Sequence, residues 1–152
     1  MKKSLLFLVL FIILAILGVF YSILFSDETV TDQSTAVING NVFEIEIANT
    51  SAKRIRGLSN RDFLPENGGM LFLFDQPEIK SFWMNEMRFP IDIIWIKEDR
   101  VVGFVESVST PVAGEELFIY SSPEPVDKVL EINAGLVRKY GIEVRNIIEL
   151  RI

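Results

Sequence analysis

The stretch GMLFLFDQPEIKSFWMNEMRFPIDIIWI, residues 69–96, decides the fold class of this chain. It consists of three apolar segments separated by two short polar connections. Because so many Phe, Trp, Ile and Met side chains must be removed from water, the stretch is predicted to form the buried centre of a β-rich domain. It does not by itself indicate a reaction.

Shorter apolar segments on both sides of this centre predict further strands. Two of them, residues 37–38 and 42–47, flank Asn39-Gly40, a pair that is typical of a tight hairpin turn. The other predicted strands are residues 70–74, 79–84, 91–96, 101–108, 117–120, 129–132 and 147–152.

Two short helices are predicted between these strands. Thr50 or Ser51 caps the first, which runs through Gly57, and Asn133 caps the second, which runs through Tyr140. Helices of ten to fifteen residues between strands are not predicted, so the pattern does not favour a parallel sheet. The predicted fold is mainly β, an antiparallel sandwich or barrel with two short helices.

An apolar segment near the N-terminus, residues 5–25, contains no charged residue. As a helix it would span about 31 Å, enough to cross the hydrocarbon core of a bilayer. Lys2 and Lys3 precede it and Asp27 and Glu28 follow it, so the positive-inside rule places the N-terminus in the cytoplasm. The alternative is a cleaved signal peptide, whose apolar region is shorter, about 7 to 15 residues.

The sequence therefore predicts three parts. Residues 1–25 form an N-terminal transmembrane anchor or uncleaved signal, and residues 26–35, which are polar, form a flexible stalk. Residues 36–152 form one extracytoplasmic β-rich domain. The predicted location is the cell membrane, with a single pass, a cytoplasmic N-terminus and the domain outside the cytoplasm.

Charge and composition exclude several kinds of function. Residues 26–152 carry 13 basic and 21 acidic side chains, a net charge of −8, which disfavours nucleic acid as a partner. The chain contains no Cys and no His, which excludes disulfides, thiol catalysis and histidine-based acid–base chemistry. Met70, Met84 and Met87 are interpreted as core residues rather than Cu(I) ligands. No metal and no cofactor is predicted.

Two carboxylates interrupt predicted central strands. Asp92 separates apolar residues within 89–96, and Glu131 lies within the apolar segment 129–132. Burying such a group costs several kcal/mol unless it is hydrogen-bonded or paired. Asp92 is therefore either a structural acceptor, for backbone N–H groups or Arg61, or an acid in a ligand site. If Asp92 and Glu131 shared a cleft, they would form a carboxylate pair like those of glycoside hydrolases.

Arginine and aromatic side chains supply further candidates for a ligand site. A turn brings Arg56 and Arg61 near one another, where they either fix a loop or bind an anionic ligand. Adjacent Phe82 and Trp83 point to opposite faces of a strand, so one of them is predicted to line a groove. The candidate ligand-binding residues are Arg61, Trp83, Asn85, Asp92 and Glu131. The catalytic residues, if any exist, are unknown.

Several short motifs resemble those of a small prokaryotic family, the domain of unknown function family 192. The motifs are Arg56-Gly57-Leu58 with Arg61, Gly69-Met70-Leu71-Phe72 with Phe74, Ser81-Phe82-Trp83-Met84-Asn85, Pro90-Ile91-Asp92-Ile93-Ile94, Tyr120-Ser121-Ser122, and Val129-Leu130-Glu131 with Ala134-Gly135. They cover nearly all of the chain from about Asn41 onward. The resemblance implies a compact, mostly β domain and implies no particular activity.

The chain departs from the family pattern at two places. The family has Trp-Met-Lys-Asn-Thr where residues 83–87 read Trp-Met-Asn-Glu-Met, so a role of that lysine is not carried over. A Gly-Asp pair of the family is replaced by Arg145-Asn146.

The predicted function is a non-catalytic binding module of the cell envelope. The membrane is its partner through the N-terminal helix, and an envelope glycan, peptide or protein is the expected ligand. The alternative is a carboxylate-based hydrolase that acts on an envelope glycan or peptide through Asp92 and Glu131.

Overall fold

The structure, a computed structural model, describes residues 33–112 and 114–152. The predicted membrane segment and residues 26–32 of the predicted stalk lie outside this range. Within the described residues, no helix combines the length and hydropathy needed to cross a bilayer. The elements are β1 (Thr35–Ile38), β2 (Asn41–Ala48), α2 (Ser51–Arg56), β3 (Gly68–Glu78), β4 (Ser81–Trp83), β5 (Ile91–Lys97), β6 (Arg100–Val108), β7 (Ile119–Ser121), β8 (Val126–Asn133), α3 (Leu136–Lys139) and β9 (Ile148–Arg151).

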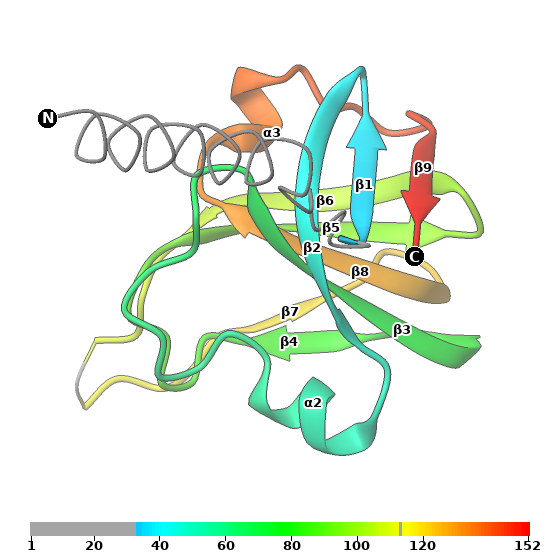
Figure 1. Ribbon diagram of the computed structural model, residues 1–152. Coiled ribbons are helices and arrows are strands. Elements are labelled where there is room, and N and C mark those ends of the chain that lie inside the picture. The colour runs from blue at the N-terminus through cyan, green and yellow to red at the C-terminus, as the bar shows by residue number, and fades with distance from the viewer. Residues whose placement is uncertain (1–32, 113) are drawn as a thin grey trace, which may run out of the picture. The chain divides into compact units, whose positions relative to one another are not determined.

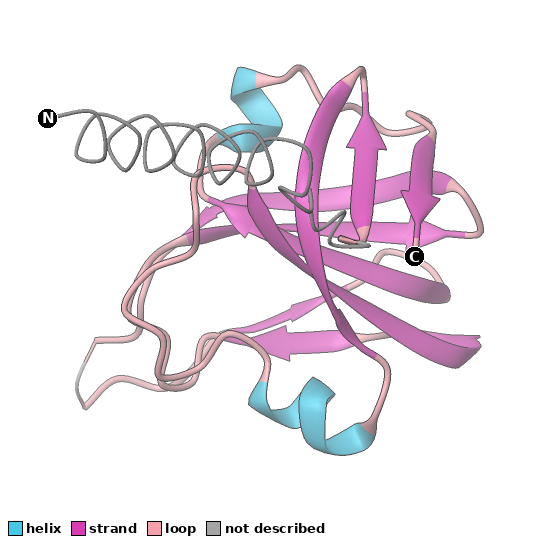
Figure 2. Ribbon diagram, in the orientation of Figure 1, coloured by secondary structure: helices cyan, strands magenta, loops and turns pink. Residues whose placement is uncertain are grey.

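Seven of these strands form one curled sheet in the order β6-β5-β8-β3-β2-β1-β9 (Figure 1). Its two edge strands meet at one end, where the Val101 N–H donates to the Asn146 carbonyl at 3.0 Å. The Ile148 N–H donates to the Asp99 carbonyl at 2.8 Å at the same end. The sheet is therefore a half-barrel, and its curl is visible in Figure 2.

Alternation along the strands creates a hydrophobic core on each face of the sheet. The inner core lies inside the curl and includes Phe43, Leu71, Ile94, Leu130 and Ile132. Leu136 and Val137 of α3 close one end of it. Because both faces are buried, the central strand β5 reads as a nearly continuous apolar run rather than an alternating one.

The outer core is covered by the two-stranded ribbon of β4 and β7 and by neighbouring loops. Phe82 of the ribbon packs edge-on against Phe72 and Trp95, with ring centroids 4.9 and 5.6 Å apart. The architecture is mainly β with two short helices, as predicted. It is a half-barrel with a ribbon on its outer face rather than a full sandwich or a closed barrel.

One strand pair corrects the prediction of a purely antiparallel sheet. β2 and β3 are parallel, with Glu44 opposite Gly68 and Ala48 opposite Phe72. A parallel pair needs a crossover connection, and residues 49–67 provide it with only one short helix, α2. The prediction missed this pair because it expected a crossover to contain a longer helix.

The first hairpin and the first helix confirm the predicted local signals. Asn39 and Gly40 have φ angles of 51° and 76°, the left-handed conformation that the tight turn between β1 and β2 requires. The Thr50 hydroxyl accepts from the Lys53 N–H at 3.3 Å and caps α2.

The second helix is shorter than predicted, because Asn133 is not its cap. Asn133 remains in β8, and its side-chain amide donates to the Pro65 carbonyl at 2.7 Å. The N-cap of α3 is Gly135, with a φ of 84°. The Asn133 side chain therefore fastens a distant loop instead of starting a helix.

Candidate functional site

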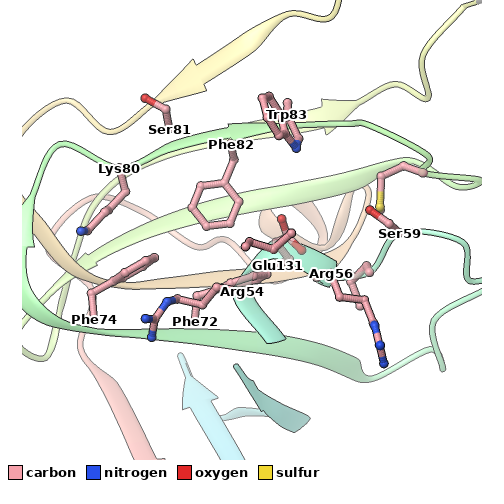
Figure 3. Close-up of a pocket in the computed structure, with 14 residues that line it drawn as sticks. Arg54, Arg56, Ser59, Phe72, Phe74, Lys80, Ser81, Phe82, Trp83 and Glu131 are labelled. Carbon is pink, nitrogen blue, oxygen red and sulfur yellow. The ribbon is translucent and has the colours of Figure 1, made fainter. Parts of the chain in front are cut away.

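The main candidate site is a pocket on the outer face of the sheet, between α2, β3, β4 and β8 (Figure 3). Its volume is about 250 Å³. We call it the Glu131 pocket, after the carboxyl group on its floor. Its lining residues are Arg54, Ile55, Arg56, Gly57, Leu58, Ser59, Phe72, Phe74, Lys80, Ser81, Phe82, Trp83, Met87 and Glu131.

Strand alternation places Glu131 on the floor of this pocket. Glu131 lies opposite Met70 of β3 and Ile93 of β5, two outer-core residues on neighbouring strands. Only 5% of its surface is exposed. Burial raises the pKa of the Glu131 carboxyl to about 8, so this group is largely protonated at neutral pH.

The Glu131 carboxyl has no hydrogen-bond partner among residues 33–112 and 114–152, and burial is the cause of its raised pKa. A protonated carboxyl has one O–H donor and further acceptor capacity, all of which is available in the pocket. Such a group is suited to binding a hydroxyl or amide, or to giving up its proton to a base.

Aromatic side chains form the walls. Phe72 and Phe74 come from β3, where they alternate with inner-core residues, and Phe82 and Trp83 come from β4. Phe72 is fully buried, whereas Trp83 is 60% exposed. The pocket therefore has a buried aromatic interior and an exposed indole at its mouth, which offers a flat apolar surface to a ligand.

Two cations gather at the Phe74 end of the pocket. The Arg54 guanidinium carbon lies 5.4 Å from the centroid of the Phe74 ring, and the Lys80 Nζ lies 4.3 Å from it. Arg54 Nη1 donates to the Leu73 carbonyl at 2.9 Å, and Lys80 Nζ lies 2.7 Å from a Glu78 carboxylate oxygen. The Lys80 side chain is only 15% exposed.

The structure brings Trp83 and Glu131, two of the predicted site residues, into this one pocket. Asn85 lines an adjoining hollow, which Trp83, Ile55 and Arg56 also line. The Asn85 carbonyl accepts from the Ser59 hydroxyl at 2.8 Å, which fastens the loop after β4 to the chain after α2.

Arg61 lies apart from the Glu131 pocket. Its guanidinium forms a two-pronged ion pair with Glu46 of β2, in which Nη2 lies 2.8 Å from Oε2. The pKa of Glu46 is lowered, and the largest cause is this hydrogen bond from Arg61. Arg61 lines a separate hollow with Glu46 and Lys53. Of the two partners considered for Asp92, backbone N–H groups and Arg61, Arg61 is therefore not the one used.

Asp92 is fully buried and acts as a structural acceptor. Its Oδ1 accepts from the N–H groups of Ser107 at 2.7 Å and Gly135 at 3.0 Å, and its Oδ2 from Val137 N–H at 2.8 Å. The Asp92 side chain thus links a bulge of β6 to the start of α3. This is the structural alternative of the two that the sequence left open.

The two carboxylates lie on opposite faces of the sheet. Asp92 is directly opposite Ile132 of β8, an inner-core residue, whereas Glu131, one position earlier, faces the outer side. The carboxylate pair on which the predicted hydrolase depended is therefore not formed, because a shift of one residue reverses the face of a side chain.

Sequence reasoning missed Arg54, Phe74 and Lys80 as site residues. Phe74 follows Phe72 by two positions, a spacing that puts both rings on one face of a strand. Arg54 and Lys80 carry no comparable signal, because only the folded chain places the helix after β2 beside the start of β4.

Comparisons with known proteins agree with the fold. No curated protein matches the chain. A crystal structure of a protein of unknown function from Novosphingobium aromaticivorans is 32% identical, with a TM-score of 0.69, and the match covers 77% of this chain and 83% of that one. A protein from Sinorhizobium meliloti, described as a "putative transcription regulator", is 27% identical, with a TM-score of 0.69 and coverage of 77% and 93%.

The family predicted from the sequence motifs is confirmed. The profile of the DUF192 family, described as "Uncharacterized ACR", matches residues 34–150. This range contains every element from β1 to β8 and α3, and thus the whole Glu131 pocket. The chain belongs to the DUF192 family of uncharacterised proteins.

Proposed function

We propose that this protein is a non-catalytic binding module of the cell envelope and that its ligand occupies the Glu131 pocket. The observation that carries the proposal is the Glu131 carboxyl, which is buried on the floor of an aromatic pocket without a hydrogen-bond partner among the described residues. Apolar pockets with a few polar groups directed inward are the usual form of small-molecule sites.

The energetic cost of this arrangement supports a binding role. A buried polar group that lacks a partner destabilises a fold by roughly 1 to 3 kcal/mol. A leucine at position 131 would avoid this cost and would continue the apolar face of β8. Groups that reduce stability in this way are typical of functional sites.

Binding accounts for the pocket better than hydrolysis. Glu131 is the one carboxyl group among the described residues that line it, and Asp92 lies across the sheet. The exposed indole of Trp83 supplies a stacking surface for a sugar ring or a peptide side chain. A volume of about 250 Å³ fits one such unit of an envelope glycan or peptide, or a free compound of similar size.

The envelope location is part of the proposal and rests on the sequence. Residues 5–25 are long and apolar enough to anchor the chain in a membrane, with the domain outside the cytoplasm. The pocket would then meet compounds of the envelope rather than cytoplasmic metabolites.

Ligand-induced stabilisation of the full-length chain tests the binding role. We expect some members of a library of small polar aromatic compounds and sugars to raise the unfolding temperature of the wild type. The increase should disappear in Glu131→Leu and in Trp83→Ala. Phe63→Ala is the matched control, because Phe63 is 73% exposed and does not line the pocket.

Two results would contradict the proposal. In one, no compound stabilises the wild type. In the other, the active compounds stabilise Glu131→Leu as strongly as the wild type, which would place their binding elsewhere.

A further inference from the structure

The polar groups of the Glu131 pocket lie at two separate places. Figure 3 shows Arg54 and Lys80 directed toward Phe74 from either side, whereas Glu131 lies farther along the pocket near Phe82. Neither cation is a cause of the pKa shift of Glu131, which results from burial. A ligand that uses both places therefore needs an apolar body between two polar ends.

The Phe74 end of the pocket is suited to an anion. Arg54 and Lys80 both lie against the Phe74 ring, so a ligand cation would meet two positive charges already in contact with that ring. Arg54 uses one of its five N–H donors on the Leu73 carbonyl, and Lys80 uses one of its three on Glu78. The remaining donors can bind a carboxylate or phosphate.

The acidity of the whole domain does not reverse this local preference. The net charge of −8 for residues 26–152 belongs mainly to exposed side chains, whose fields are screened within about 8 Å at physiological ionic strength. Lys80 is only 15% exposed, and Arg54 is half-buried, so their charges are screened much less.

The Glu131 end of the pocket is suited to an uncharged polar group. The protonated carboxyl can exchange two hydrogen bonds with a hydroxyl or an amide, without burying a second charge. The volume of about 250 Å³ is below the roughly 300 to 1,000 Å³ of pockets for drug-sized ligands, so the ligand is small.

We propose that the Glu131 pocket binds a small free anion whose carboxylate or phosphate meets Arg54 and Lys80 at the Phe74 end and whose hydroxyl or amide reaches Glu131. Its middle part is an aromatic ring or a compact apolar group, which packs against Phe72 and Phe82. This assignment rests on the proposed binding function and names the class of ligand.

Calorimetric titration of the full-length chain with 3-(4-hydroxyphenyl)propanoate tests the assignment. This probe carries an anion, an aromatic ring and a hydroxyl in the proposed order. Replacing its carboxylate with a carboxamide, or with an aminomethyl group, should weaken binding at least about tenfold, the usual effect of losing a hydrogen bond to a charged group. Removing its hydroxyl should weaken binding about threefold to tenfold.

Protein variants locate the two ends of the probe. Arg54→Gln and Lys80→Gln should each weaken the acid about tenfold and leave the carboxamide nearly unchanged. Lys53→Gln is the matched control, because Lys53 lies on the same helix, is exposed and does not line the pocket. The wild type should bind the analogue that lacks the hydroxyl more weakly than the probe. Glu131→Leu should bind the probe itself at least that weakly.

The results separate this inference from the proposed function. If the amine binds as tightly as the acid, the anion assignment is wrong but the binding function stands. If none of these probes binds, the assignment is also wrong, and the compound library decides whether the pocket binds another class. If either Gln variant fails to fold, the acid-to-carboxamide ratio of the wild type still decides the charge of the ligand.

Discussion

Two acidic side chains, Asp92 and Glu131, are buried in neighbouring strands but have opposite surroundings. Three backbone N–H groups donate to Asp92, whereas Glu131 has no such partner among the described residues. Burial without such hydrogen bonds favours the protonated form of Glu131. The same residue class thus contributes to the fold at one position and to a candidate site at the other.

Replacing Asp92 should destabilise the protein. We expect Asp92→Ala to lower the free energy of unfolding by roughly 2 to 4 kcal/mol, because three buried N–H groups lose their acceptor. Chemical unfolding of the full-length chain measures the loss. Asp75→Ala is the control, since Asp75 is exposed and should change stability by less than about 0.5 kcal/mol. A loss that small for Asp92→Ala would contradict the structural role.

Replacing Glu131 should change how stability depends on pH. Its folded-state pKa of about 8 lies above the unfolded value of 4.5, so folding favours the proton. Below about pH 4.5 Glu131 is protonated in both states, and its ionisation does not reduce the stability of the wild type. As the pH rises from there through about 8, the unfolded state loses this proton first and the wild type loses stability. Glu131→Gln cannot ionise, so its advantage over the wild type should grow by roughly 3 to 5 kcal/mol across this window.

Unfolding both proteins at pH 5, 7 and 8.5 checks this prediction. Other titratable groups affect both proteins alike, so the difference between them reports Glu131 alone. A difference that stays constant with pH would show that Glu131 keeps its ordinary pKa.

In the two-stranded ribbon of β4 and β7, strand β4 contributes side chains both to the outer core and to the Glu131 pocket. Phe82 and Tyr120 are cross-strand partners that face the outer core, while Trp83 and Ile119 are partners on the exposed face. The ribbon is held to the sheet by the Phe82 ring, which contacts Phe72 and Trp95. Strand alternation therefore separates Phe82, which anchors the ribbon and lines the pocket interior, from Trp83, which lies at the pocket mouth.

Adjacent substitutions in β4 should have unequal effects. We expect Phe82→Ala to lower the free energy of unfolding by roughly 2 to 4 kcal/mol, because it removes a packed aromatic ring. Trp83→Ala should cost less than about 1 kcal/mol, since Trp83 is 60% exposed. Chemical unfolding of both variants provides the test, and equal losses would contradict the assigned orientation of the strand.

At the scale of the whole molecule, the proposed function includes a location outside the cytoplasm, which the sequence predicts. Lys2 and Lys3 before the apolar segment and Asp27 and Glu28 after it favour an outside location. The location determines which compounds can reach the Glu131 pocket.

Protease accessibility tests this orientation. Protease added to intact cells whose outer layers have been removed should digest the domain or release it by cutting within residues 26–35. A cytoplasmic protein in the same sample should remain intact and serves as the control. Protection of the domain until the membrane is broken would contradict the predicted orientation.

The sequence alone determined the family, the β-rich class and the local turns of this protein. These features depend on short-range patterns: the left-handed turn at Asn39-Gly40, the cap at Thr50 and the apolar run of β5. Each of them is encoded by neighbouring residues, so no knowledge of distant contacts was needed.

Only the tertiary structure decided the strand order and the site. The parallel pairing of β2 and β3 and the meeting of β6 with β9 join segments far apart in the chain. The registers of β5 and β8 put Asp92 and Glu131 on opposite faces, and the fold places Arg54 and Lys80 against the same Phe74 ring. These placements depend on long-range strand pairing, in which a shift of one residue would move every side chain of a strand to the other face of the sheet.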